Sequence, residues 1–139
     1  MNPYIVIFDG PDKTGKSTLK DAFNKATNYL HFVIDRGPLS NLVYNSIFNR
    51  NHNIDYSKMI DHLSSFNHLI VLCTAPENLV NERLEANNEI LPNGSTFSST
   101  MKMFEFFLYQ SPFKYVIIDT SQPIDLCVNQ IVKTLEKGD

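Results

Sequence analysis

An eight-residue loop near the N-terminus constrains the fold of this chain more than any other feature. Residues 10–17 read Gly-Pro-Asp-Lys-Thr-Gly-Lys-Ser and match the pattern G-x-x-x-x-G-K-[ST] without a mismatch. An apolar run typical of a strand precedes the loop, and an amphipathic segment typical of a helix follows it. The glycines let the backbone curl so that successive N–H groups face a phosphate at the positive end of the helix dipole. The loop therefore predicts a nucleoside triphosphate site between a strand and a helix.

Two side chains of this loop have expected roles of their own. Lys16 is expected to bridge the β- and γ-phosphates, and the Ser17 hydroxyl is expected to ligate Mg²⁺. ATP and Mg²⁺ are therefore the expected cofactors. The other predicted nucleotide contacts of this region are Gly10, Pro11, Asp12, Lys13, Thr14, Gly15 and Thr18. A glycine-containing turn without a ligand is the alternative interpretation.

The rest of the chain alternates between strand-like and helix-like patterns. Four short apolar runs predict strands at Tyr4–Phe8, His31–Ile34, Leu69–Cys73 and Tyr115–Ile118. They lack strict polar alternation, which is typical of parallel strands buried on both faces. Apolar residues recur at helical spacing within 19–30, 39–47, 59–66, 79–84 and 124–135. The pattern predicts a three-layer α/β fold with about four parallel strands, whose ligands bind beyond the carboxyl ends of the strands.

Composition limits the class of protein. The 139 residues fit a single domain, 1–139. The net charge of −3 disfavours a broadly basic nucleic-acid coat, although it leaves room for a local basic groove. No apolar run approaches the roughly 20 residues that cross a bilayer, and the N-terminus lacks the basic region of a signal peptide. Cys73 and Cys127 lie far apart in apolar segments, so we expect reduced core cysteines in a cytoplasmic protein without membrane contact.

A carboxylate and a guanidinium follow the second predicted strand. Asp35 and Arg36 end this strand and should face the same crevice as the phosphate loop. Asp35 is expected to bind Mg²⁺ through water or to accept a proton from an attacking hydroxyl. Arg36 is expected to hold phosphoryl oxygens bidentately. A local ion pair that caps the next helix is the alternative.

These motifs together resemble the thymidylate kinase family and, more loosely, the deoxynucleoside kinases. The resemblance rests on residues 8–18, Phe-Asp-Gly-Pro-Asp-Lys-Thr-Gly-Lys-Ser-Thr, and on Asp35-Arg36 with Ser40 and Tyr44. It extends over most of the chain, because the segment 69–76 leads to Arg83 and the segment 119–123 is similar to the family's adenine loop. It implies a P-loop kinase fold in which Arg83 and Thr120 contact the donor nucleotide. For Arg83, a position on the helix surface is an equal alternative.

The resemblance also implies where catalytic charge comes from. In some family members an acid inside the phosphate loop contacts the acceptor sugar and a neighbouring base supplies charge; Asp12 and Lys13 occupy these positions, with Lys replacing the usual Arg. The lid-like segment at about 85–99 agrees with this assignment, because Glu85–Gly94 contains no Arg or Lys. The implied catalytic set is Lys13, Lys16, Asp35 and Arg36. A homodimer is a further expectation from the family.

The acceptor is less constrained than the donor. The family carries an extra strand and an arginine-bearing region before the Asp-Arg strand, which this chain lacks, and the chain has only Arg36, Arg50 and Arg83. A pyrimidine deoxynucleotide kinase with a reduced acceptor region is the first hypothesis. A kinase of a hydroxyl on nucleic acid, such as 5-hydroxymethyluracil in phage DNA within the host cytoplasm, is the second, and a non-catalytic nucleotide switch is the third.

The aromatic residues that could stack on a flipped base, or equally pack in the core, are Phe97, Phe104, Phe106, Phe107 and Tyr109.

Overall fold

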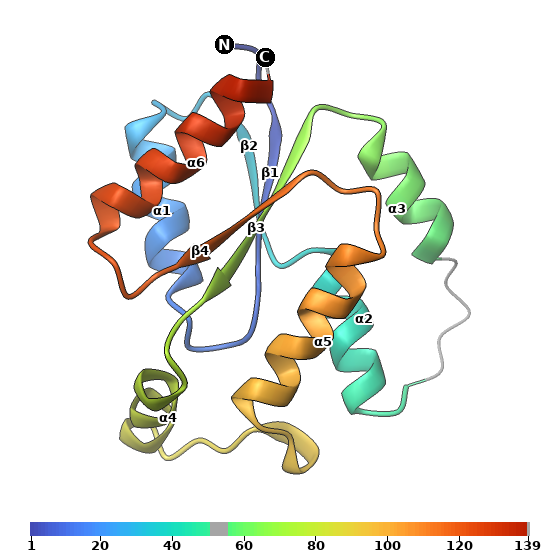
Figure 1. Cartoon of the computed structure of the whole chain (residues 1–139), viewed down its shortest axis with the longest axis vertical. Coiled ribbons are helices and arrows are strands. Elements are labelled where there is room, and N and C mark those ends of the chain that lie inside the picture. Colours follow the sequence, from blue (N-terminus) through green and yellow to red (C-terminus); the bar gives the residue numbers. More distant parts are fainter. Residues whose placement is uncertain (51–55, 139) are drawn as a thin grey trace.

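The computed structural model describes residues 1–50 and 56–138, which form four strands and six α-helices around one sheet (Figure 1). The strands are β1 (Ile5–Asp9), β2 (Phe32–Asp35), β3 (His68–Thr74) and β4 (Tyr115–Asp119). The helices are α1 (Lys16–Ala26), α2 (Pro38–Ile47), α3 (Tyr56–Ser64), α4 (Glu77–Ala86), α5 (Phe97–Tyr109) and α6 (Ile124–Gly138). A short 3₁₀ turn, η1 (Pro92–Gly94), lies between α4 and α5.

The sheet is parallel throughout and has the strand order β2-β1-β3-β4. Residues on opposite faces of β1 belong to two different apolar clusters. Phe8 belongs to the cluster that includes α1 and α6, whereas Ile7 belongs to the cluster that includes α2, α4 and α5. Figure 1 shows α1 and α6 on one side of the sheet and α2, α3 and α5 on the other. The predicted three-layer α/β architecture with about four parallel strands is therefore confirmed.

The burial of the strands divides the sheet into a centre and two edges. β1 and β3 are buried along nearly their whole length, as predicted. The prediction is wrong for β2 and β4, which lie at the edges and expose side chains such as Phe32 and Tyr115. A sheet of four strands has two edges, and short apolar runs do not distinguish an edge strand from a central one.

Two helical segments differ from the sequence pattern. The first helix ends at Ala26 rather than near Leu30, because Asn28 and Tyr29 take left-handed φ angles of 52° and 58°. Leu30 is consequently exposed. Helix α5 was missed by the periodicity above; it begins with a capping box in which Thr96 accepts a hydrogen bond from the Ser99 amide.

Both cysteines are buried and free, as expected, and burial raises the pKa of the Cys73 thiol to about 12. Within residues 1–50 and 56–138, no helix combines the length and the apolar character that crossing a bilayer requires.

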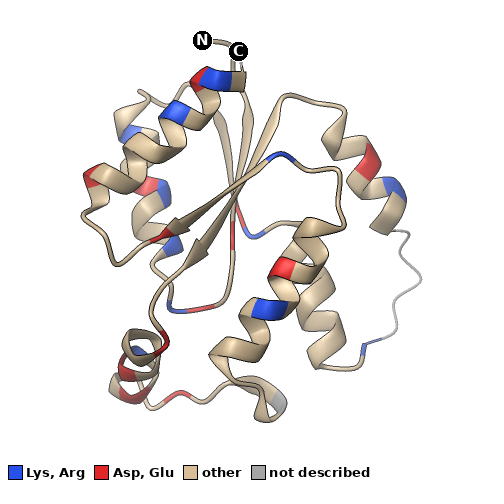
Figure 2. Cartoon of the chain, viewed as in Figure 1, with Lys and Arg blue, Asp and Glu red and all other residues tan. Residues whose placement is uncertain are grey.

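Figure 2 shows acidic and basic residues side by side in the loop after β1, where the strands end.

The loop after β1 requires glycine at its first position. Gly10 has φ +132°, and a Cβ atom there would lie 2.4 Å from the Cys73 carbonyl oxygen of β3. Both the backbone angle and the close approach of β3 exclude a side chain. The phosphate loop is therefore packed directly against the neighbouring strand.

We predict that Gly10→Ala lowers the free energy of unfolding by about 2–4 kcal/mol, because the added methyl meets rigid backbone. Gly94→Ala is the matched control: its φ is +69°, but no atom lies within 4 Å of the added Cβ. The control should lose about 1 kcal/mol. Urea unfolding of the two variants measures both values, and equal losses would contradict the packing argument.

Candidate active site

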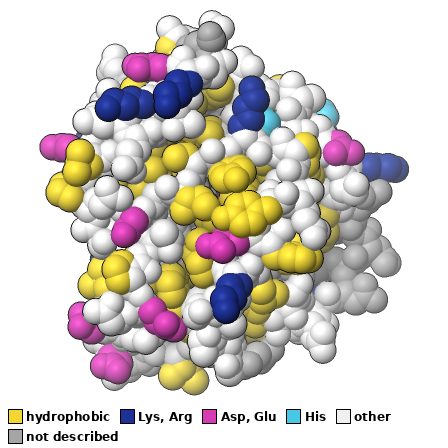
Figure 3. All heavy atoms as spheres, viewed as in Figure 1, with side chains coloured by type: hydrophobic (Ala, Val, Ile, Leu, Met, Phe, Trp, Pro, Cys, Tyr) yellow, Lys and Arg dark blue, Asp and Glu magenta, His cyan; other side chains and the backbone are white. Residues whose placement is uncertain are grey.

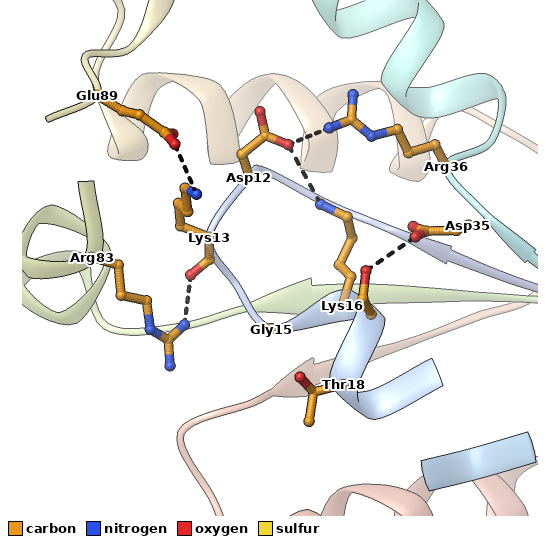
Figure 4. A pocket seen from close by; sticks show the side chains of 10 residues that line it. Asp12, Lys13, Gly15, Lys16, Thr18, Asp35, Arg36, Arg83 and Glu89 are labelled. Carbon is orange, nitrogen blue, oxygen red and sulfur yellow. Dashed lines mark hydrogen bonds and ion pairs between the residues drawn. The ribbon is translucent and has the colours of Figure 1, made fainter. Parts of the chain in front are cut away.

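An open cavity of about 730 Å³ lies where β1 and β2 end (Figure 4). The phosphate loop, the first turn of α1, the end of β2 and the end of α4 surround it. Its lining residues are Asp12, Lys13, Gly15, Lys16, Ser17, Thr18, Asp35, Arg36, Arg83 and Glu89. We call this space the first cavity. The structure thus brings the phosphate loop and the Asp35-Arg36 pair together at one edge of the sheet.

Lys16 lies at the floor of this cavity and is buried. Its ammonium donates hydrogen bonds to the carbonyls of Gly10 and Pro11, at 2.9 and 3.0 Å, and lies 3.9 Å from the Asp12 carboxylate. Burial lowers the pKa of Lys16, and the Asp12 charge opposes that effect. The ammonium is thus held at the loop, where phosphate oxygens can replace carbonyl oxygens as its acceptors.

The expected magnesium ligands are neighbours. The Ser17 hydroxyl donates to the Asp35 carboxylate at 3.3 Å, across the gap between α1 and β2. Among the described residues, no group of three or more His, Cys, Asp or Glu side chains could hold a metal ion. A hydroxyl beside one carboxylate fits Mg²⁺, since this ion keeps several waters and takes further oxygens from phosphates.

A second cavity, of about 270 Å³, adjoins the first and shares two residues with it. The shared residues are Asp12 and Arg36, whose side chains form an ion pair of 2.6 Å. The other residues of the second cavity are Ser40, Asn41, Tyr44, Asn45, Phe48, Arg50 and Pro92. Burial raises the pKa of Tyr44 to about 12, and its hydroxyl is protonated at neutral pH, as an ordinary tyrosine hydroxyl is.

A buried carboxylate below the loop connects these parts. Asp9 is fully buried and accepts hydrogen bonds from the Gly10 amide, the Ser40 amide and the Ser40 hydroxyl. Gly37 passes so close that a Cβ atom there would lie 2.5 Å from Ile7 Cγ2 and 3.4 Å from Asp9 Oδ2. Asp9 thus links the end of β1 to the start of α2, the helix that follows Arg36 in the chain.

Of the two residues that the resemblance assigns to the donor nucleotide, Arg83 lines the first cavity and Thr120 lies outside it. The Arg83 guanidinium donates to the Lys13 carbonyl at 2.6 Å. The Thr120 hydroxyl donates to the carbonyls of Thr14 and Thr74. Both residues line a small cavity of about 140 Å³, whose floor includes Leu19 and Ile124. This position fits the rim of a base subsite, with the Thr120 hydroxyl itself bound to the main chain.

Some predicted contacts do not reach a cavity surface. Gly10, Pro11 and Thr14 are the buried residues of the loop besides Lys16, and the Thr14 hydroxyl donates to the Pro11 carbonyl at 2.7 Å. Among the described residues that line the first and second cavities, Glu89 and Arg50 are the charged ones that the motifs did not assign. A charge opposite Lys13 was not foreseeable, because the position of Glu89 depends on how α4 ends.

The aromatic residues considered for base stacking line neither the first nor the second cavity. Phe97 and Phe104 are buried in the core, and Phe107 packs against it. Phe106 and Tyr109 are exposed. Figure 3 shows hydrophobic side chains gathered on the face that carries β4 and α5. The core interpretation therefore holds for Phe97, Phe104 and Phe107.

Comparisons with known proteins agree with the fold. The chain matches no protein-family model, and it matches no curated protein sequence. Solved structures do match: YorR from Bacillus subtilis, in complex with phosphorylated GDP, aligns over 95% of both chains with 18% identity and a TM-score of 0.77. Deoxyadenosine kinase from M. mycoides with bound dCTP aligns over 96% of this chain and 99% of its own, with 16% identity and a TM-score of 0.65. The chain therefore has the P-loop kinase fold, as predicted.

We predict that the buried Asp9 carboxyl makes the free energy of unfolding depend on pH. Burial raises the pKa of its carboxyl above the ordinary value of 3.8, although hydrogen bonds from Ser40 and Gly10 oppose the rise. Above that value the unfolded chain has released this proton while the native chain retains it, so rising pH costs the native state stability until the native group ionises. Asp9→Asn removes this loss.

The measurement is the free energy of unfolding of Asp9→Asn minus that of the wild type, taken from about pH 4 to about pH 8. The difference should increase with pH and then level off. A difference that is flat or decreases with pH would show that the Asp9 pKa is not raised in the native state.

Proposed function

We propose that this protein is a kinase that transfers a phosphoryl group from Mg²⁺·ATP to a pyrimidine deoxynucleotide. The observation that carries the proposal is the Asp12–Arg36 pair, which belongs to both cavities. Phosphoryl transfer requires two substrates in line with little covalent help from the protein. Two cavities that meet at one guanidinium offer that arrangement.

The first cavity is the proposed donor site. Backbone amides of the phosphate loop and the Lys16 ammonium would hold the phosphates, and Arg83 and Thr120 would border the base. Ser17 and Asp35 would hold Mg²⁺, which neutralises charge on the transferred group when it is bound. Arg36 adds positive charge at the junction, where charge develops during transfer.

The second cavity is the proposed acceptor site. Arg36 and Arg50 both line it, so an acceptor that carries a phosphate meets two guanidinium groups. Tyr44 and Phe48 contribute rings, and Asn41 contributes an amide of the kind that hydrogen-bonds a base edge. This composition supports a phosphorylated acceptor in a chain that lacks the family's extra arginine-bearing region.

The position of Asp35 also favours a phosphate acceptor over a hydroxyl acceptor. A hydroxyl acceptor gains from a general base within hydrogen-bond reach. Asp35 lines the first cavity only, and its carboxylate accepts from Ser17 rather than facing Tyr44 or Asn41. Its placement therefore supports a metal-binding role more than the role of a base for 5-hydroxymethyluracil in DNA.

Product analysis with ATP, Mg²⁺ and a panel of acceptors tests the proposal. The panel contains deoxynucleoside monophosphates, free nucleosides, and DNA with and without hydroxymethylated pyrimidines. A pyrimidine deoxynucleoside diphosphate product is expected, and Lys16→Ala should abolish it while Lys25→Ala, on the exposed end of α1, retains it. Label in DNA would replace the acceptor assignment with the nucleic-acid hypothesis. Bound ATP without transfer to any acceptor would overturn the kinase proposal in favour of a switch.

We predict that Arg50→Gln raises the KM for a deoxynucleoside monophosphate by about 10-fold or more, because one charged partner of the acceptor phosphate is lost. The KM for ATP should stay within about twofold, since Arg50 does not line the first cavity. Lys102→Gln, on the exposed side of α5, is the control and should change neither constant. Steady-state kinetics measures both, and an equal rise in both KM values would contradict the acceptor assignment.

A further inference from the structure

Lys13 of the phosphate loop is held from two sides by the end of α4. The Arg83 guanidinium donates to its carbonyl at 2.6 Å, and its ammonium lies 3.1 Å from the Glu89 carboxylate. Figure 4 shows the Lys13 side chain pointing toward Glu89 and away from Lys16. The family resemblance assigns catalytic charge to Lys13. In this structure the Lys13 ammonium is paired with the Glu89 carboxylate.

The position of Glu89 follows from the way α4 ends. Asn88 takes a left-handed φ of 53°, and the Glu89 amide donates to the Leu84 carbonyl at 2.9 Å. This closed turn directs the chain back toward the phosphate loop, so that Glu89 lines the same cavity as Lys13 and Lys16. The pair thus bridges the predicted lid-like segment and the donor site.

We propose that Glu89 is an internal competitor of the donor's phosphates for Lys13. Binding of a nucleoside triphosphate exchanges the carboxylate for phosphate oxygens at the Lys13 ammonium, and this exchange releases residues 87–91 from the loop. Glu89 therefore lowers donor affinity and couples the segment after α4 to occupancy of the cavity. The inference rests on the donor site of the proposed function and not on the identity of the acceptor.

The electrostatics favour an exchange over a permanent pair. The side chains of Lys13 and Glu89 are 28% and 47% exposed, and ion pairs at such positions are weak. A triphosphate brings several negative charges into the same cavity and offers shorter, charge-assisted hydrogen bonds. Glu89, by contrast, adds a carboxylate to a space that receives a polyanion, so its charge opposes binding.

Direct binding of Mg²⁺·ATP to four forms of the full chain tests the proposal: wild type, Glu89→Gln, Lys13→Met and the double variant. Glu89→Gln should lower the Kd by about three- to tenfold, because it frees Lys13 and removes a repelling charge. In the Lys13→Met background only the repelling charge of Glu89 remains to be removed, so the same change should lower the Kd by a smaller factor than in the wild type. Glu82→Gln, at an exposed position of α4, is the control and should leave the Kd unchanged.

Two results would overturn the inference. An unchanged or higher Kd in Glu89→Gln would show that Glu89 does not compete with the donor. An equal gain in both backgrounds would show a general charge effect without exchange at Lys13. Because the readout is binding, tight ATP binding without transfer would defeat the proposed function and leave this inference intact.

Discussion

One buried carboxylate holds the candidate site together. Asp9 lies at the end of β1 with no exposed surface, and its hydrogen bonds run to Gly10 in the phosphate loop and to Ser40 in α2. A carboxylate in such a position is costly unless donors surround it. The bonds that compensate this cost also fix α2 relative to the loop. Arg36 lies in the chain between β2 and α2, and its side chain pairs with Asp12 of the loop.

Under the proposed function, an acidic chain binds phosphate groups through a local concentration of arginines. The net charge is −3, yet all three arginines line connected or adjoining cavities: Arg36 the first and second, Arg50 the second, and Arg83 the first. Concentrating positive charge at one edge of the sheet serves phosphoryl transfer better than a basic surface would, because charges near the reacting atoms act with less solvent screening.

The parts of the site that are local in sequence could be predicted. The phosphate loop carries its own glycines and lysine, and Asp35 could be placed near Ser17 because parallel strands end at one edge. The second cavity could not be predicted, since Phe48 and Pro92 are brought together only by packing of distant segments. Glu89 was missed for the same reason, and the exposed faces of β2 and β4 were missed because apolar runs do not reveal strand order.

Under the proposed function, donor and acceptor bind side by side in an arrangement of two cavities that meet at Asp12 and Arg36. The most direct test of this arrangement is the affinity for a bisubstrate analogue in which adenosine and thymidine are joined through their 5′ positions by five phosphates. If both cavities are filled at once, the analogue should bind at least about 100-fold more tightly than Mg²⁺·ATP, because one molecule supplies both binding energies. An affinity equal to that of ATP would contradict the account, since only the first cavity would then be in use.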